Sequence, residues 1–288
     1  MSAPPLRTAI SDTYPNPSNA TARAGFGALY DYVTSFQFGQ CRLVKSGANL
    51  VLQRLDGLWL AINDKMYAIP AAGVALAPTG LTPNTNYFVY AFMSGATMTL
   101  EAVTTAPATD ANTGVRIKNG DAARTLVGQV RVIAGPAFAD TTNQRYVLTW
   151  FNRRPIHCFL PISGDVSTSS GSQVEVEASW RPSFLAWSGD LVSFGANGAY
   201  SGSVPSTISM ALYSNGGCLP LGITDAYAAG TISSAGYLLP FGVSSNLLAT
   251  ADGLGSISLY GATGAGLATW KGGASPGLRS SISVVVQG

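Results

Sequence analysis

His157 is the only histidine in this chain of 288 residues, and it stands next to Cys158. These two residue types commonly supply the base and the nucleophile of hydrolases. Adjacent residues on a strand point to opposite faces, so the apolar stretch 155–159 keeps the two side chains apart. A zinc or iron site needs more ligands of this kind than one histidine provides. We interpret His157 as a packed or interface residue, and we predict no metal and no cofactor.

Glu175 and Glu177 have a spacing that suits acid–base chemistry. Two residues apart on a strand, they would share one face at a separation of about 7 Å. Inverting glycosidases use a separation of that order. The apolar alternates Val174 and Val176 give a simpler explanation, in which the pair is the solvated face of an amphipathic strand. We predict a non-enzyme, with an enzyme that degrades surface polysaccharide as the less favoured alternative.

Neither the glycines nor the basic residues point to phosphate chemistry. The run 261–266 lacks the spacing of the dinucleotide and P-loop fingerprints, and no strand–helix–strand pattern surrounds it. Arg116, Lys118, Arg124 and Arg131 lie among apolar alternates. Binding of single strands would need stacking aromatic residues on the same face. We therefore predict no nucleic-acid partner.

Aromatic residues of the C-terminal part are the remaining candidates for ligand contact. Sugar-binding sites stack the sugar ring on an exposed aromatic side chain and hold its hydroxyls with a few placed polar groups. On that basis we predict glycan contacts at Asn197, Tyr200, Tyr213, Asp225 and Tyr227. Of these we expect Asn197 with Tyr200, and Asp225 with Tyr227, to lie in loops. The alternative is that these aromatic residues belong to the core or to subunit contacts.

The composition indicates self-association. Only 10% of the residues are charged, against roughly a quarter in an average soluble domain. Between Arg181 and Lys271 the only charged residues are Asp190, Asp225 and Asp252. A surface with so little charge opposes association weakly. We expect a homo-oligomer in which the C-terminal domain supplies much of the contact.

No apolar run reaches the roughly 18 residues that a membrane-spanning helix needs, so we predict no membrane insertion. The N-terminus shows no basic, apolar leader, and we expect the chain to stay in the cytoplasm in which it is made. Cys41, Cys158 and Cys218 are odd in number and far apart. We expect buried free thiols.

The order of strand and turn signals predicts an all-β protein. We expect residues 1–39 to form an extended arm with one short helix, because prolines dominate the first part and a capped Ala-rich stretch follows. Two β-sandwich-like domains are expected to follow, at residues 40–162 and 173–288, and the second should be of jelly-roll type. A Ser/Thr/Gly linker at residues 163–172 would join them. The alternation of leucines around Asp56-Gly57 predicts a hairpin there. Tyr87, at the start of an apolar strand, is expected to return its hydroxyl to the nearby backbone.

Part of this chain resembles a known group of proteins. The stretch GLTPNTNYFVYAFMSGATMTLEAVTTAPATDANTGVRIKNGDAARTLVGQVRV, together with RYVLTWFNRR, is similar to tail-fibre and other virion-associated proteins of tailed bacteriophages. The opening arm looks like the segments that anchor such proteins, and this assigns attachment to Tyr14, Pro15, Pro17, Phe26, Leu29 and Tyr30.

The resemblance implies a virion component that is made in the host cytoplasm and is a homotrimer. Its N-terminal half would contact other virion proteins, and its C-terminal half would face outward toward a host-surface glycan. A head fibre or capsid decoration protein without a host ligand stays open as the alternative.

Overall fold

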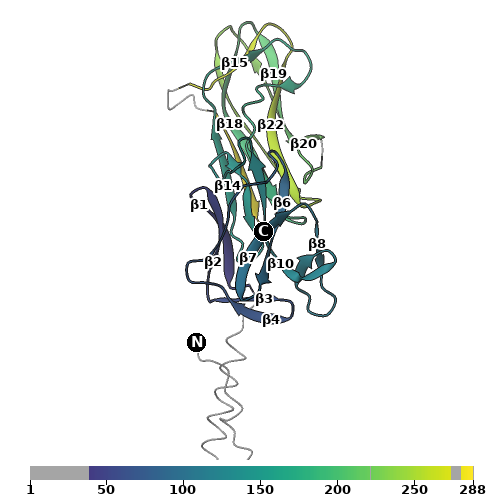
Figure 1. Cartoon of the computed structure of the whole chain (residues 1–288). Helices are drawn as coiled ribbons and strands as arrows, with labels where there is room; N and C mark the ends of the chain where they lie inside the picture. The colour runs from purple at the N-terminus through teal and green to yellow at the C-terminus, as the bar shows by residue number, and fades with distance from the viewer. Residues whose placement is uncertain (1–38, 221, 274–279, 288) are drawn as a thin grey trace, which may run out of the picture.

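The computed structural model describes residues 39–220, 222–273 and 280–287, with side chains of 222–226 left out. In these residues the regular structure is entirely β, which confirms the predicted fold class. Figure 1 shows two β bodies stacked end to end. The predicted arm, its short helix and the six attachment residues lie outside the described residues.

The N-terminal body is built from short sheets around one apolar core. A three-stranded sheet has the order β1 (Cys41–Ser46), β2 (Asn49–Arg54), β5 (Val74–Leu76). A larger sheet has the order β7 (Thr97–Val103), β6 (Asn86–Ser94), β10 (Asp121–Ile133), β9 (Arg116–Lys118), β8 (Pro107–Thr109), with β11 (Ala137–Phe138) and β13 (Val147–Thr149) also on β10. A separate hairpin pairs β3 (Trp59–Ile62) with β4 (Lys65–Ala68).

The hairpin predicted at Asp56-Gly57 does not form. β2 pairs with β1 and β5, and the strand after the turn pairs onward with β4. Asn63 and Asp64, both with positive φ, make the two-residue hairpin turn instead. The Asp-Gly signal marks a real turn, but the partner of each strand is decided by which faces the core can bury.

Tyr87 forms the predicted corner. Its side chain is buried, and its hydroxyl oxygen accepts a hydrogen bond from the backbone N–H of Thr82 at 2.9 Å. The bond ties the 81–85 turn to the first residues of β6, the strand that β7 and β10 flank. The local pattern of a turn followed by Tyr and an apolar strand was therefore sufficient to predict this contact.

We expect Tyr87→Phe to lower the free energy of unfolding by about 1 kcal/mol, because it leaves the Thr82 N–H without its partner while it keeps the ring. Denaturant unfolding at equilibrium measures the change. Tyr67→Phe is the matched control, since no hydrogen bond of the Tyr67 hydroxyl is seen among the described residues. Equal stability of the two variants would show that the corner bond contributes nothing.

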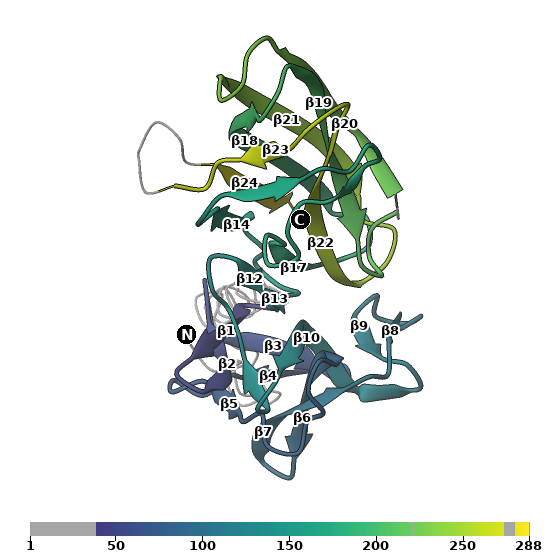
Figure 2. The ribbon, with the colours of Figure 1, turned by 90° about the horizontal axis from the view of Figure 1, so that it is seen from above.

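The C-terminal body is a sandwich of two antiparallel sheets. Sheet I comprises β16 (Val174–Glu175), β17 (Ser183–Ala186), β19 (Ser206–Asn215), β20 (Gly222–Ile232) and β22 (Gly253–Thr263), and β12 (Gln144–Arg145) joins its edge in parallel. Sheet II comprises β14 (Ile156–Pro161), β15 (Val166–Thr168), β18 (Leu191–Gly202), β21 (Leu238–Leu248), β23 (Ala268–Trp270) and β24 (Ser281–Gln287). Figure 2 shows the two sheets facing each other.

The strand order is that of a jelly roll. The broken strands β14/β15, β16/β17 and β23/β24 each occupy one position in their sheet, because both halves pair along the same edge of one neighbour. In chain order, sheet II then holds positions 1-8-3-6 and sheet I holds 2-7-4-5. This is the arrangement of two interlocked Greek keys. The prediction of a jelly roll is confirmed.

The core of the jelly roll lies between the sheets and follows the alternation seen in the sequence. Ile208, Met210 and Leu212 of β19 face Val192 and Phe194 of β18 across the sandwich interior, all within one cluster of buried side chains. Gly261 has no room for a side chain, since a Cβ there would lie 2.1 Å from the ring of Trp270. The glycine therefore permits the indole to pack against the opposite sheet.

The predicted linker 163–172 is not a linker. It contains β15, which pairs with β23, and β14 before it pairs with β24 over six residues. The chain therefore enters the jelly roll at Ile156. The small polar residues of this stretch predicted a flexible linker. In the structure they lie at the edge of a sheet, where a strand can form without large side chains.

The two bodies share a packed junction. Tyr90, Leu126 and Leu148 of the N-terminal body form one buried cluster with Leu185 and Trp187 of the jelly roll. The Trp187 indole N–H donates to the Thr149 carbonyl at 3.1 Å, and Gln129 Nε2 donates to the Ala186 carbonyl at 2.9 Å. Arg153 Nη1 lies 3.0 Å from the buried carboxylate of Asp190. These contacts predict that the two bodies behave as one unit.

Candidate functional site

The structure separates the predicted glycan contacts. Tyr200 is only 2% exposed, packs beside Phe241 and belongs to the core, so its assignment as a ligand contact is wrong. It lies within the long strand β18, where an inward position buries it. Asn197 lies on the outer face of sheet II and accepts a hydrogen bond from the Ser281 hydroxyl. It is therefore not beside the Tyr200 ring, and neither residue lies in the predicted loop.

Tyr213 and Tyr227 lie on the outer face of sheet I. β19 sends Met210 and Leu212 into the core, and the alternate residues Ala211 and Tyr213 therefore point outward. Tyr227 is directly opposite Ala211 on β20 and is 61% exposed. The backbone of Asp225 lies in β20, also not in a loop, but its side chain lies outside the described side chains.

Register adds Tyr260 and Glu175 to this face. Ala211 is opposite Tyr260 on β22, and Tyr260 is opposite Glu175 on β16. One row across the sheet therefore reads Tyr227, Ala211, Tyr260, Glu175. We call the surface formed by Tyr213, Tyr227, Tyr260, Glu175 and Arg181 the tyrosine face.

Two rings of the tyrosine face are stacked on each other. The centroids of Tyr213 and Tyr260 lie 3.9 Å apart with an interplanar angle of 30°. Desolvation by the surrounding side chains raises the pKa of Tyr213 above its ordinary value, with a smaller contribution from Tyr260. The Tyr213 hydroxyl is therefore neutral at physiological pH and available as a donor and an acceptor beside an apolar ring surface.

An ion pair borders the rings. The Arg181 guanidinium donates from two nitrogens to the two carboxylate oxygens of Glu175. The hydrogen bonds from Arg181 hold the pKa of Glu175 below its usual range, so the carboxylate is ionised at neutral pH. Glu177 points elsewhere and accepts from the backbone N–H of Ser179. The two glutamates thus do not act as a pair, because β16 ends at Glu175.

Amide and hydroxyl groups complete the surroundings. Asn215 Nδ2 donates to the Ser258 hydroxyl at 2.9 Å, and Gln173 Nε2 donates to the Ser209 hydroxyl at 2.8 Å. The Gln173 Oε1 atom has no hydrogen-bond partner in the described part of the chain. Stacked rings, a fixed ion pair and amide and hydroxyl groups lie together on one sheet face, which thereby combines an apolar ring surface with hydrogen-bond donors and acceptors.

Sequence reasoning missed Tyr260, Glu175 and Arg181 as members of the site. A local signal for Tyr260 exists, because Ile257 and Leu259 alternate with Ser256, Ser258 and Tyr260 along the strand, and this alternation indicates that Tyr260 points outward. Its neighbours depend on the register between β19, β22 and β16, which are far apart in sequence. That register was not readable from any one strand.

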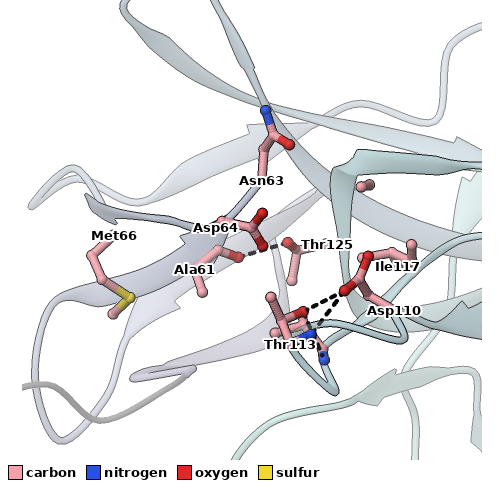
Figure 3. Close-up of a pocket in the computed structure, with 10 residues that line it drawn as sticks. Ala61, Asn63, Asp64, Met66, Asp110, Thr113, Ile117 and Thr125 are labelled. Atoms are coloured by element: carbon pink, nitrogen blue, oxygen red, sulfur yellow. Dashed lines mark hydrogen bonds between the residues drawn. The ribbon is translucent and has the colours of Figure 1, made fainter.

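A separate pocket of about 250 Å³ lies in the N-terminal body between the β3–β4 hairpin and the segment that contains the loop between β8 and β9. Figure 3 shows Asp110 directed at Thr113, and Thr125 directed at Ala61. Asp110 accepts from the backbone N–H groups of Asn112 and Thr113, which lowers its pKa, and the Thr125 hydroxyl donates to the Ala61 carbonyl at 2.6 Å. These polar groups stabilise the fold around a largely apolar pocket.

The cysteines are buried free thiols, as predicted, and burial raises the pKa of each to about 12. Within residues 39–220, 222–273 and 280–287 there is no group of three or more His, Cys, Asp or Glu placed to hold a metal ion. The same residues include no helix with the length and apolarity needed to cross a bilayer.

No protein-family model matches the chain, and no curated protein matches it. Among solved structures, a chain of the T13 particle of infectious bursal disease virus (IBDV) is similar at 14% identity, with a TM-score of 0.28. The match covers 74% of this chain and 56% of that chain. The VP2 subviral particle of the same virus is similar at 17% identity and a TM-score of 0.22, covering 72% of this chain and 58% of that one.

A third similar structure is the insecticidal delta-endotoxin Cry8Ea1 from Bacillus thuringiensis, at 8% identity and a TM-score of 0.24, covering 86% of this chain and 52% of that chain. This chain therefore spans little more than half the length of the chains it matches. Identities and scores of this size establish neither a common fold nor a common function.

Proposed function

We propose that this protein is a non-catalytic structural and binding component of a tailed-phage virion, of the fibre or adhesin class. The observation that carries the binding role is the tyrosine face on the outer surface of the jelly roll. Jelly rolls serve as viral structural domains and as lectin domains. The phage assignment rests on the sequence resemblance between Gly80 and Arg154.

The ligand class follows from the chemistry of the tyrosine face. The stacked rings present an apolar surface to the flat side of a sugar ring, while the Glu175–Arg181 pair and the amides offer both donors and acceptors to hydroxyls. Glu175 is bonded to Arg181 and carries a lowered pKa, so it is a poor general acid. We therefore propose glycan binding without cleavage.

Glycan-array binding of the full chain tests this proposal. We expect binding to a restricted set of bacterial surface saccharides, with no release of reducing ends from them. Absence of binding across such an array, together with labelled particles in which the protein lies flat on the capsid, would favour the alternative of a capsid decoration or head-fibre protein without a host ligand.

We also propose that copies of the chain associate through the outer face of sheet II. None of its strands, β14, β15, β18, β21, β23 and β24, contains an Asp, Glu, Lys or Arg. Most of its outward positions are small or apolar, including Ser193, Gly195, Ser244 and the exposed Leu248. Copies of this chain suit the face because faces without such residues can gather around a common axis without like-charge repulsion or the desolvation of ions. A trimer around this face leaves sheet I outward.

Sedimentation of the wild-type chain and of Ser193→Glu tests the interface. We expect a trimer, three times the chain mass of 29.7 kDa, for the wild type. The variant should be largely monomeric, because each added carboxylate would be buried without a partner. Ser234→Glu, at an exposed turn position beyond β20, is the control and should stay trimeric. A monodisperse wild-type monomer at micromolar concentration would rule the interface out.

A further inference from the structure

A strongly basic cleft lies where the chain passes from the N-terminal body into the jelly roll. It has a volume of about 210 Å³ and lies between β1, the end of β13 and the first residues of β14. Its cationic lining residues are Arg42, Lys45, Arg145, Arg153 and Arg154, beside His157. Asp140 is the acidic residue of the lining.

Positive charge exceeds negative charge in this cleft. Asp140 is bonded to Arg145 at 3.2 Å, and Arg153 is bonded to Asp190 at 3.0 Å. No carboxylate within the described residues pairs with Arg42, Lys45 or Arg154. Asp140 is also close enough to Lys45 and Arg42 to interact with their charges. Cations in excess of carboxylates repel one another, and an anion placed among them reduces that repulsion.

The geometry points to a compact oxyanion as the ligand. Arginine forks bind carboxylate and phosphate oxygens in pairs, which a neutral ligand cannot exploit. The volume is below the roughly 300 Å³ at which ordinary small-molecule pockets begin, so it suits one anionic group and not a folded segment. We propose that this cleft binds a carboxylate or phosphate group, which is carried by a saccharide if the proposed function holds.

The cleft is distinct from the tyrosine face, and it meets sheet II only at Ile156 and His157 of β14. Its lining residues come from β1, the 140–149 region and residues 153–157, and none of the tyrosine face belongs to it. The proposal therefore goes beyond neutral glycan contact. Variants of the cleft residues test anion binding, and variants of the tyrosine face test glycan binding, so the failure of one proposal can be distinguished from the failure of the other.

Arg153 provides an internal reporter. Its guanidinium lies over the Trp150 ring at 4.4 Å from the centroid and near the Trp187 ring at 5.7 Å. An anion that approaches Arg153 changes the electric field at both indoles. Tryptophan emission should therefore respond to occupation of the cleft, alongside the heat measured by calorimetry.

The experiment titrates the intact protein at low salt with inorganic phosphate, with glucuronate and with neutral glucose. We expect saturable binding of phosphate or glucuronate with a change in tryptophan emission, weakening at higher salt, and none for glucose. Arg42→Ala combined with Arg154→Ala should weaken anion binding at least about tenfold, since it removes two charges without a carboxylate partner. Lys65→Ala, which removes an exposed cation outside the cleft, should leave it unchanged.

Three results would overturn the proposal. They are saturation by neither anion, equal affinity in the wild type and the double arginine variant, and equal binding of glucose. A far-ultraviolet circular dichroism spectrum and a melting curve of the double variant establish that it is folded. If it is not, Arg154→Ala alone, at an exposed position, takes its place in the same titration.

Discussion

Replacing Trp187 by alanine is expected to lower the free energy of unfolding by about 3–5 kcal/mol and to divide one unfolding transition into two. The cost is the usual one for deleting a buried tryptophan, because lost apolar burial and a residual cavity add together. The division follows from the position of the residue, which joins the jelly roll to the N-terminal body.

The contacts of Trp187 explain both effects. Its side chain is 1% exposed and packs edge-on against Trp150 at 5.0 Å, and its indole N–H donates to the Thr149 carbonyl. Trp150 and Thr149 belong to the segment that leaves the N-terminal body, so alanine removes apolar contact and a hydrogen bond across the junction at once. When the junction is weakened, each body should unfold in a separate transition with its own melting temperature.

Differential scanning calorimetry measures the effect. Trp180→Ala is the control, because Trp180 is also buried but belongs to the core of the jelly roll alone. It should destabilise that body without uncoupling it from its neighbour. A single transition in Trp187→Ala with a loss below about 1 kcal/mol would contradict a tightly packed junction.

The second large effect is expected on binding. Tyr260→Ala should weaken glycan affinity by about thirtyfold or more, which corresponds to the roughly 2 kcal/mol at which a contact residue counts as a hot spot. Tyr260 is the centre of the tyrosine face, since it stacks on Tyr213 and is opposite Glu175 in the sheet. Its loss removes its own ring and leaves the Tyr213 ring unsupported.

Stability and binding must be separated in this variant. Tyr260 is half-buried on the outside of the sheet, so alanine should cost far less stability than a core deletion. Tyr237→Ala removes a tyrosine that is 55% exposed at the turn before β21, away from the tyrosine face, and should bind normally. Tyr260→Phe keeps the ring and should retain most of the affinity.

The sequence predicted the layers of this protein well because alternation survives in nearly every long strand. Ile208, Met210 and Leu212 are buried where the period of two places them. Tyr87 also makes its predicted contact, because a corner depends on residues only five positions apart.

Features that depend on distant partners were not predictable in this way. The Asp56-Gly57 signal is a turn, but the strand after it pairs with β4. The stretch 163–172 contains a strand only because β23, a hundred residues later, offers an edge. Tyr200 looked like a loop residue and is a core residue, since β18 continues through it.

The tyrosine face also combines features that local sequence predicts with features that depend on distant strands. Outward positions of Tyr213 and Tyr260 follow from local alternation, whereas their stacking follows from the register of β19 with β22. The junction with its basic cleft could not be anticipated, because it joins β1 to a segment more than a hundred residues later.

Binding of an array-selected saccharide to the wild type, Tyr260→Ala and Tyr237→Ala, measured side by side by calorimetry, tests the central claim most directly. The tyrosine face predicts matching affinities for the wild type and Tyr237→Ala, and a loss of about thirtyfold or more for a folded Tyr260→Ala. Equal affinity in all three would contradict the assignment of ligand binding to this face of the jelly roll.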